Sequence, residues 1–177
     1  MNMLGLRLLL VTVLLGGALS GCSLLSPFTT CEGTASAVAK LNELPALALR
    51  PAGAVPIDEE AEAQAYCTED SGDAGLTARR LYAYDGSRTE VQEYYARAAP
   101  AAGWHPVHSL TTQPEAGFSV FCFESDRHPS VTLAFESPEE LREVYGVDPG
   151  PEPAGPGSRI WFQLFAEAAT DGSRMGC

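Results

Sequence analysis

The stretch RRLYAYDGSRTEVQEYYARAAPAAGW, residues 79–104, decides the fold because it predicts a strand, a turn and a helix in direct succession. Its opening, RRLYAYD, alternates in the way that puts successive side chains on opposite faces of a strand. Ser87 and Glu90 follow in the S-x-x-E spacing of a capping box, which satisfies two amide donors at the start of a helix. We therefore expect a strand over 79–85 and a helix that begins after Ser87.

The expected helix has one apolar face and a defined end. The apolar positions recur at helical spacing and are Val91, Tyr94, Tyr95, Ala98 and Ala102. Gly103 ends the helix, and Pro100 is expected to kink or shorten its last turn.

Downstream of this helix, the pattern predicts short strands, a short helix and a final strand. The expected strands are 104–108, 118–125, 130–136 and 159–168. A second capping box, Ser137 with Glu140, carries proline at the first helical position and starts the short helix. The buried face of that helix is expected to consist of Leu141, Val144 and Tyr145.

Upstream, the N-terminal third is helical and rich in loops. A helix is expected over 32–44, with Ala35, Val38, Leu41 and Leu44 on one face. A Pro-punctuated loop (45–56), an acidic stretch compatible with a helix (57–66) and a second loop (68–75) follow. The whole pattern predicts a single α+β domain of order β-α-β-β-β-α-β, an antiparallel sheet of about five strands with helices on one face.

The N-terminus predicts export and lipid attachment. Arg7 precedes an apolar run at 8–18, which is shorter than the ~20 apolar residues of a membrane-spanning helix and is typical of a secretory signal. The run ends in Leu19-Ser20-Gly21-Cys22, which resembles the bacterial lipobox. The resemblance implies that Cys22 carries diacylglycerol in thioether linkage and that a peptidase cuts before it. The alternative is an ordinary signal with an incidental cysteine.

These observations divide the chain and place it in the cell. The expected parts are a lipoprotein signal peptide at 1–21, a lipid-anchored tether at 22–30 and one α+β domain at 31–177. The run at 82–104 also resembles a strand, helix and Gly-Trp pattern of small actinobacterial lipoproteins, a family without assigned active residues. Both resemblances imply a lipid-anchored protein on the extracytoplasmic face of the cell membrane.

Charge limits the partners. The chain has 23 acidic residues against 11 Lys and Arg, a net charge of −12. An acidic domain repels nucleic acid and anionic lipid, so we expect neither as a partner, and membrane attachment must come from the lipid on Cys22. The remaining expected partners are an envelope protein or a small apolar ligand.

The cysteine count agrees with export. With Cys22 lipidated, four of the five cysteines remain, which predicts two disulfides in an oxidising compartment. Three connectivities are open. We favour Cys31–Cys67, which would staple the N-terminal segment, and Cys122–Cys177, which would pin the C-terminal tail. No C-x-x-C pair suggests a zinc knuckle or a redox motif.

Titratable residues predict no catalytic or metal site. His105 and His108 lie three apart on an expected strand and so point to opposite faces, and His128 lies in a turn. The acidic loop 68–75 lacks the ligand pattern of an EF-hand. Nucleophile elbows, zinc-protease motifs and phosphate loops are absent from the sequence, so we expect no cofactor.

Aromatic residues offer the remaining candidate site. Residues 159–168 place Phe162 and Leu164 on one face of the final strand and Trp161 and Phe165 on the other. A sheet covered on one side would expose one of these rows. Either the N-terminal helix covers the second face, which we favour, or Trp161 and Phe165 line a groove for a ligand or partner.

Together these patterns predict a binding or protein-interaction module rather than an enzyme. The alternative is a small envelope hydrolase with a dispersed active site, which would need a histidine close to a carboxylate in the folded chain.

Overall fold

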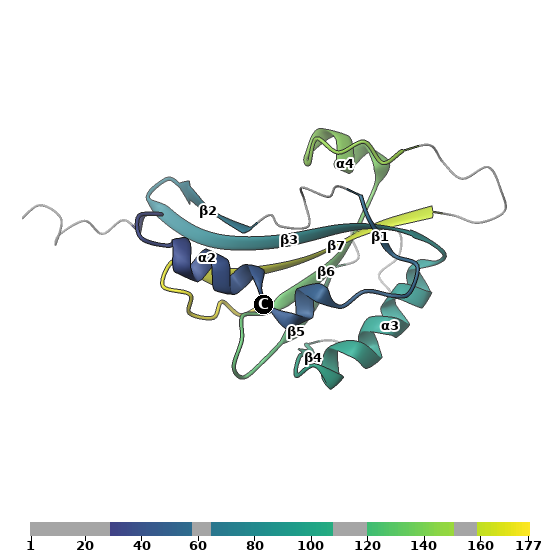
Figure 1. The fold of residues 1–177 in the computed structure, drawn as a ribbon, viewed down its shortest axis with the longest axis horizontal. Helices are drawn as coiled ribbons and strands as arrows, with labels where there is room; N and C mark the ends of the chain where they lie inside the picture. Colours follow the sequence, from purple (N-terminus) through teal and green to yellow (C-terminus); the bar gives the residue numbers. More distant parts are fainter. Residues whose placement is uncertain (1–28, 58–64, 108–119, 151–158) are drawn as a thin grey trace, which may run out of the picture.

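The computed structural model describes residues 29–57, 65–107, 120–150 and 159–177, and within these ranges the chain forms one antiparallel sheet of seven strands (Figure 1). The strands are β1 (Val55–Pro56), β2 (Ala65–Asp70), β3 (Asp73–Asp85), β4 (His105–Pro106), β5 (Val120–Glu124), β6 (Val131–Glu136) and β7 (Arg159–Ala169). Their order is β1-β3-β7-β6-β5-β4, and β2 pairs with the first half of β3. The helices are α2 (Ala35–Asn42), the 3-10 helix η2 (Pro45–Ala48), α3 (Arg88–Ala101) and α4 (Pro138–Glu143). The α+β fold with an antiparallel sheet is confirmed, with more strands than the sequence predicts.

A hairpin replaces the loop expected at residues 68–75. Residues 65–70 form β2, and β3 begins at Asp73. Ser71 and Gly72 have φ angles of 52° and 92°, the pair of positive values that a tight two-residue hairpin turn requires. β2 escapes sequence analysis because most of its residues are exposed, so alternation between apolar and polar residues is weak. Residues 58–64 of the acidic stretch lie outside the described residues.

Helices cover both faces of the sheet, which corrects the expectation of helices on one face. α2, η2 and α3 pack on the face that carries Phe162 and Leu164, where the main core lies. α4 packs on the opposite face, against Leu81 and Trp161. Figure 1 shows α4 on the other side of β3 and β7 from α2 and α3. Consecutive residues of β7 therefore serve two separate cores.

The helix starts agree with the sequence more closely than the helix faces do. Ser87 and Ser137 each form the expected capping box, with Glu90 and Glu140. The buried residues of α3 are Val91, Gln92, Tyr95 and Ala99, a face rotated from the predicted one. α3 runs through Pro100 and ends one residue later. None of the described helices is long and apolar enough to span a membrane.

Val144, predicted to be buried, is 68% exposed. α4 ends at Glu143, so Val144 no longer follows the helical face that Leu141 begins. Val147 packs against Leu141 and Trp161 instead, and its amide donates to the carbonyl of Leu141 at 2.9 Å.

The cysteines pair as the sequence analysis favours. Cys31 is bonded to Cys67 with a Cα–Cα distance of 5.7 Å, which joins the segment before α2 to β2. Cys122 is bonded to Cys177 with a Cα–Cα distance of 6.2 Å, which joins β5 to the C-terminal tail.

Candidate functional site

Trp161 is buried beneath α4 rather than lining a groove. It is 6% exposed and packs with Leu81, Leu141 and Val147. α4 and the residues after it cover Trp161, whereas the sequence analysis favours the N-terminal helix for this position. Phe165 lies half-buried on the same face. Neither aromatic residue lines any of the four best-formed clefts in the described part of the chain, so none of these clefts contains the expected site.

A buried polar cluster adjoins Trp161. Gln163 Nε2 donates to Glu136 Oε1 at 2.5 Å and to the Tyr145 hydroxyl at 2.8 Å. The Tyr145 hydroxyl donates to the same Glu136 oxygen at 3.5 Å, and the Arg79 guanidinium lies 4.6 Å from the centre of the Tyr145 ring. These contacts join β6, β7 and β3 to the segment that follows α4.

Burial controls the protonation of this cluster. It raises the pKa of Glu136 above its ordinary value, and the nearby charge of Glu140 adds to the rise. Hydrogen bonds from Gln163 and Tyr145 and the charge of Arg79 oppose the rise without cancelling it. Burial also raises the pKa of the Tyr145 hydroxyl. The hydrogen bonds of the Tyr145 hydroxyl with Glu136 and Gln163 tie the segment after α4 to β6 and β7, so the cluster helps to hold α4 on the sheet.

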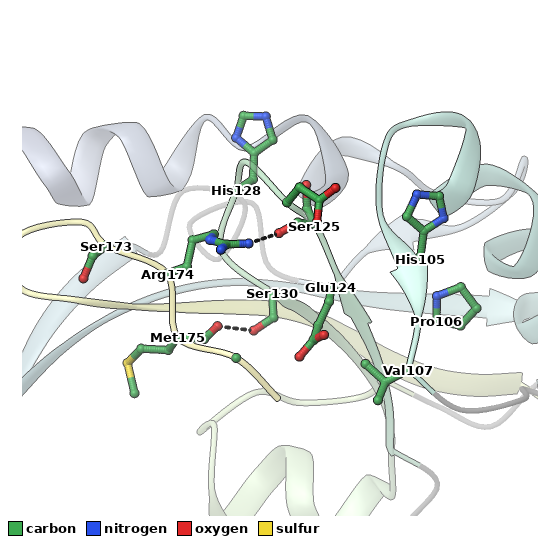
Figure 2. Close-up of a pocket in the computed structure, with 12 residues that line it drawn as sticks. His105, Pro106, Val107, Glu124, Ser125, His128, Ser130, Ser173, Arg174 and Met175 are labelled. Atoms are coloured by element: carbon green, nitrogen blue, oxygen red, sulfur yellow. Dashed lines mark hydrogen bonds between the residues drawn. The ribbon is translucent and has the colours of Figure 1, made fainter.

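The candidate site is a cleft of about 640 Å³ at the ends of β4 and β5 (Figure 2). The connection between β5 and β6 forms one side, and the C-terminal tail forms another. β4 and the residue after it contribute His105 and Val107, β5 contributes Glu124, the connection contributes Asp126 and His128, and the tail contributes Arg174 and Met175. The cleft thus mixes charges of both signs with apolar side chains.

Residues 173–177, which we call the strap, reach the sheet through a few polar contacts and one covalent bond. Three contacts involve side chains: the Arg174 guanidinium to the Ser125 carbonyl, Ser130 Oγ to the Met175 carbonyl at 2.8 Å, and the Cys177 amide to Glu124 Oε1 at 3.3 Å. Figure 2 shows the first two of these hydrogen bonds. The backbone adds the Ala169 amide to the Ser173 carbonyl at 3.0 Å and a bridge between Ala168 and Arg174. The Cys122–Cys177 disulfide fastens the far end of the strap. The Cys122–Cys177 disulfide therefore holds this wall of the cleft in place.

His105 has no hydrogen-bonded or ion-paired carboxylate among the described residues. It faces Glu124 in the register of β4 and β5, yet the two side chains point away from each other (Figure 2). Its partner in the predicted strand, His108, lies outside the described residues. The oriented histidine–carboxylate pair of a general base is therefore not formed by His105.

His128 is held by an aromatic contact instead of a carboxylate. Its ring stacks on the ring of Trp104, with centroids 5.1 Å apart and planes at 22°. Trp104 is only 1% exposed, and its indole N–H donates to the Pro129 carbonyl at 3.0 Å. His128 thus has a fixed place on the rim between this cleft and a neighbouring one of about 610 Å³ beside α2.

Two acidic residues of the β2–β3 hairpin accept hydrogen bonds from neighbouring residues. At the β2–β3 hairpin, Glu69 accepts from the Cys31 amide at 3.3 Å and Asp70 accepts from the Ser71 hydroxyl at 2.9 Å. Within the described ranges, no group of three or more His, Cys, Asp or Glu side chains could hold a metal ion.

Sequence reasoning missed the cleft because its walls come from distant parts of the chain. Arg174 and Met175 show no motif, and His105 and Glu124 lie on different strands. One signal was available: a Cys122–Cys177 bond brings the residues before Cys177 next to β5. The same bond is predicted above to pin the C-terminal tail, and its effect on the residues before Cys177 follows from it.

The chain was also compared with known proteins. A scan against protein-family models, a search of curated proteins and a search of solved structures each give no match.

Proposed function

We propose that this protein is a lipid-anchored, extracytoplasmic binding module that takes its ligand in the cleft beside the strap. The observation that carries the proposal is a cleft of ligand size, about 640 Å³, in which His105, His128, Arg174 and Glu124 gather. One wall of this cleft is fixed by a disulfide. A wall held in place before binding lowers the conformational entropy lost on binding.

The charges of the cleft favour a ligand with both anionic and cationic groups. Arg174 donates to the Ser125 carbonyl, and no carboxylate of the described residues pairs with its guanidinium. Glu124 and Asp126 supply the opposite charge. A small apolar ligand would displace water from these charged groups without replacing the hydrogen bonds that the water makes, which costs free energy. A peptide segment of an envelope protein satisfies both signs and is the ligand we propose.

The fold supports an anchor at one end of the sheet. The Thr29 amide donates to the Gly72 carbonyl at 3.1 Å, and the Ala74 amide donates to Thr29 Oγ1 at 2.7 Å. The chain therefore enters the domain at the β2–β3 hairpin (Figure 1). From Cys22 to Thr29 an extended chain spans at most ~25 Å, so a lipid on Cys22 would hold the domain close to the membrane.

Site-specific photo-crosslinking tests the binding function. A photoreactive residue at Val107, which lines the cleft, should give a covalent adduct with the ligand in intact cells. The matched control is Val55, which is also exposed, at 60% against 42% for Val107, and lies outside this cleft. Adducts at Val55 alone, at both positions equally, or at neither would contradict the proposal.

No observation favours the alternative hydrolase. It requires His105, His108 or His128 close to a carboxylate; neither His105 nor His128 hydrogen-bonds to one among the described residues, and His108 lies outside them. We therefore propose the binding function alone.

A further inference from the structure

The strap depends on its disulfide more than on packing. All residues from Asp171 to Cys177 are exposed, and the side chain with the most apolar surface, Met175, is 46% exposed. Apolar burial therefore contributes little to holding the strap. What remains besides the disulfide is a few hydrogen bonds, each of which contributes little net stability in water.

The two disulfides differ in their surroundings. Cys67 packs against the main core, and Cys31 is half-buried. Cys177 is exposed, and its partner Cys122 is half-buried. Cys177 is thus the exposed residue among the four bonded cysteines, and we expect a thiolate from solvent to attack its sulfur first. Exposed disulfides are the ones that exchange readily with external thiols.

We propose that Cys122–Cys177 is a redox-modification site, reduced by a dithiol oxidoreductase, and that its reduction releases the strap and opens the cleft. The inference rests on the proposed function only for the consequence of opening. In the first step, a thiolate of the dithiol attacks Cys177 Sγ, forms a mixed disulfide and releases the Cys122 thiolate, which takes up a proton. In the second step, the other thiol of the dithiol loses its proton, and its thiolate attacks the dithiol sulfur that is bonded to Cys177 Sγ. The Cys177 thiolate leaves and takes up a proton, so Cys177 is released as the thiol. Two electrons pass to the protein, and the dithiol becomes a disulfide.

Release of the strap changes the binding site in two ways. Arg174 and Met175 leave the cleft with the strap, which removes the cationic group on that side. Glu124 loses the Cys177 amide that donates to it, so its carboxylate becomes free to bind another donor. The strap meets β7 only at the last residues of that strand, where Ala168 forms a bridge with Arg174 and the Ala169 amide donates to the Ser173 carbonyl at 3.0 Å. The Cys31–Cys67 bond and the pairing of β6 with β7 do not involve the strap, so the domain should stay folded.

The test uses the folded, oxidised full-length protein with dithiothreitol as the dithiol. Reaction is stopped by alkylation at set times, and mass spectrometry reports which cysteines have been labelled. We expect Cys122 and Cys177 to be labelled at least about tenfold faster than Cys31 and Cys67. Equal rates, or faster labelling of Cys31 and Cys67, would overturn the proposal.

Hydrogen exchange on the same samples reports the conformational consequence. Reduction of Cys122–Cys177 should abolish protection in the strap and leave the amides of β6, and those of β7 before Ala169, protected, because the Ala169 amide donates to the Ser173 carbonyl of the strap. The C177S variant should show the same pattern without any reductant, and C31S/C67S serves as the control in which the strap stays protected. A strap that stays protected after reduction, or exchange that rises throughout the sheet, would contradict the inference.

Neither measurement uses a ligand, so the two proposals can fail separately. A Val107 adduct that forms in the wild type and is lost in C177S supports both. Absence of the adduct in the wild type counts against the binding function and leaves the redox result standing.

Discussion

Glu136 is a carboxylate that folding removes from water and surrounds with donors. It is 8% exposed and accepts hydrogen bonds from Gln163 and Tyr145. Burial raises its pKa, so the folded chain holds the proton more tightly than the unfolded chain does. The stabilisation that follows is fully present at pH values below the unfolded pKa, and it is lost as the pH rises through the folded pKa. The domain therefore loses stability at this position toward neutral pH.

The Glu136→Gln variant should not lose stability at this position as the pH rises toward neutral. The amide oxygen of glutamine can accept the same hydrogen bonds, and the side chain carries no charge to desolvate. We expect the variant to melt a few degrees above the wild type at pH 8 and to show little difference near pH 4, as measured by thermal unfolding across pH. Glu93→Gln, at an exposed position of α3, is the control and should shift little at either pH. A Glu136→Gln variant that is less stable than the wild type at pH 8 would show that the charged form is the favoured one.

α4 is too short to be stable alone, so it depends on its cap and on the surface it covers. It contains six residues, far fewer than an isolated helix needs. Ser137 accepts from the Glu140 amide at 3.1 Å, and Glu140 accepts from the Ser137 amide at 2.7 Å. The cap and the contact of Leu141 with Trp161 together keep Trp161 buried on the second face of the sheet.

Ser137→Ala should loosen α4 while leaving α3 intact. Loss of a serine cap costs about 1 kcal/mol of stability. Hydrogen exchange should accelerate at the Leu141 and Val144 amides, which donate to the carbonyls of Ser137 and Glu140. Ser137→Asp restores a capping acceptor and should return both measurements to wild-type values. Equal acceleration in α3 would mean that the substitution acts on the whole domain.

The molecule as a whole is a sheet with one hydrophobic core on each face. The chain enters the domain at the β2–β3 hairpin, and the strap lies beside β5, where it forms one wall of the cleft. The larger core holds Tyr82, Tyr95, Phe123 and Phe162, and the smaller one holds Trp161 beneath α4. Cys31–Cys67 lies near the entry and Cys122–Cys177 near the cleft. Each bond thus stabilises a part of the chain that carries little apolar surface of its own.

Anchoring through Cys22 is the prediction that concerns the molecule in its cell. Cys22→Ala should abolish labelling by a palmitate analogue and move the protein out of the membrane fraction, because thioether attachment requires the thiol. Ser23→Ala, the control, should keep both properties. If the Cys22→Ala protein stayed in the membrane fraction, another attachment would have to be sought.

The sequence by itself determined the local features of this protein. The capping boxes at Ser87 and Ser137 and the opposite faces of Phe162 and Trp161 depend on residues within a few positions of one another. Such features survive in any fold that keeps the helix or strand. The antiparallel α+β class followed from them, and the cysteine pairs were the favoured ones among three alternatives.

The tertiary structure alone decided the rest. Which element covers Trp161, which strand pairs with residues 65–70 and where a cleft opens depend on contacts between distant residues. The cleft needs the strap beside β5, and Cys177 is 55 positions from Cys122. Several chain paths satisfy the same local pattern, and they differ only in how well their side chains pack and in which polar groups find partners. That choice is made by the packing of the whole chain, which periodicity and spacing do not record.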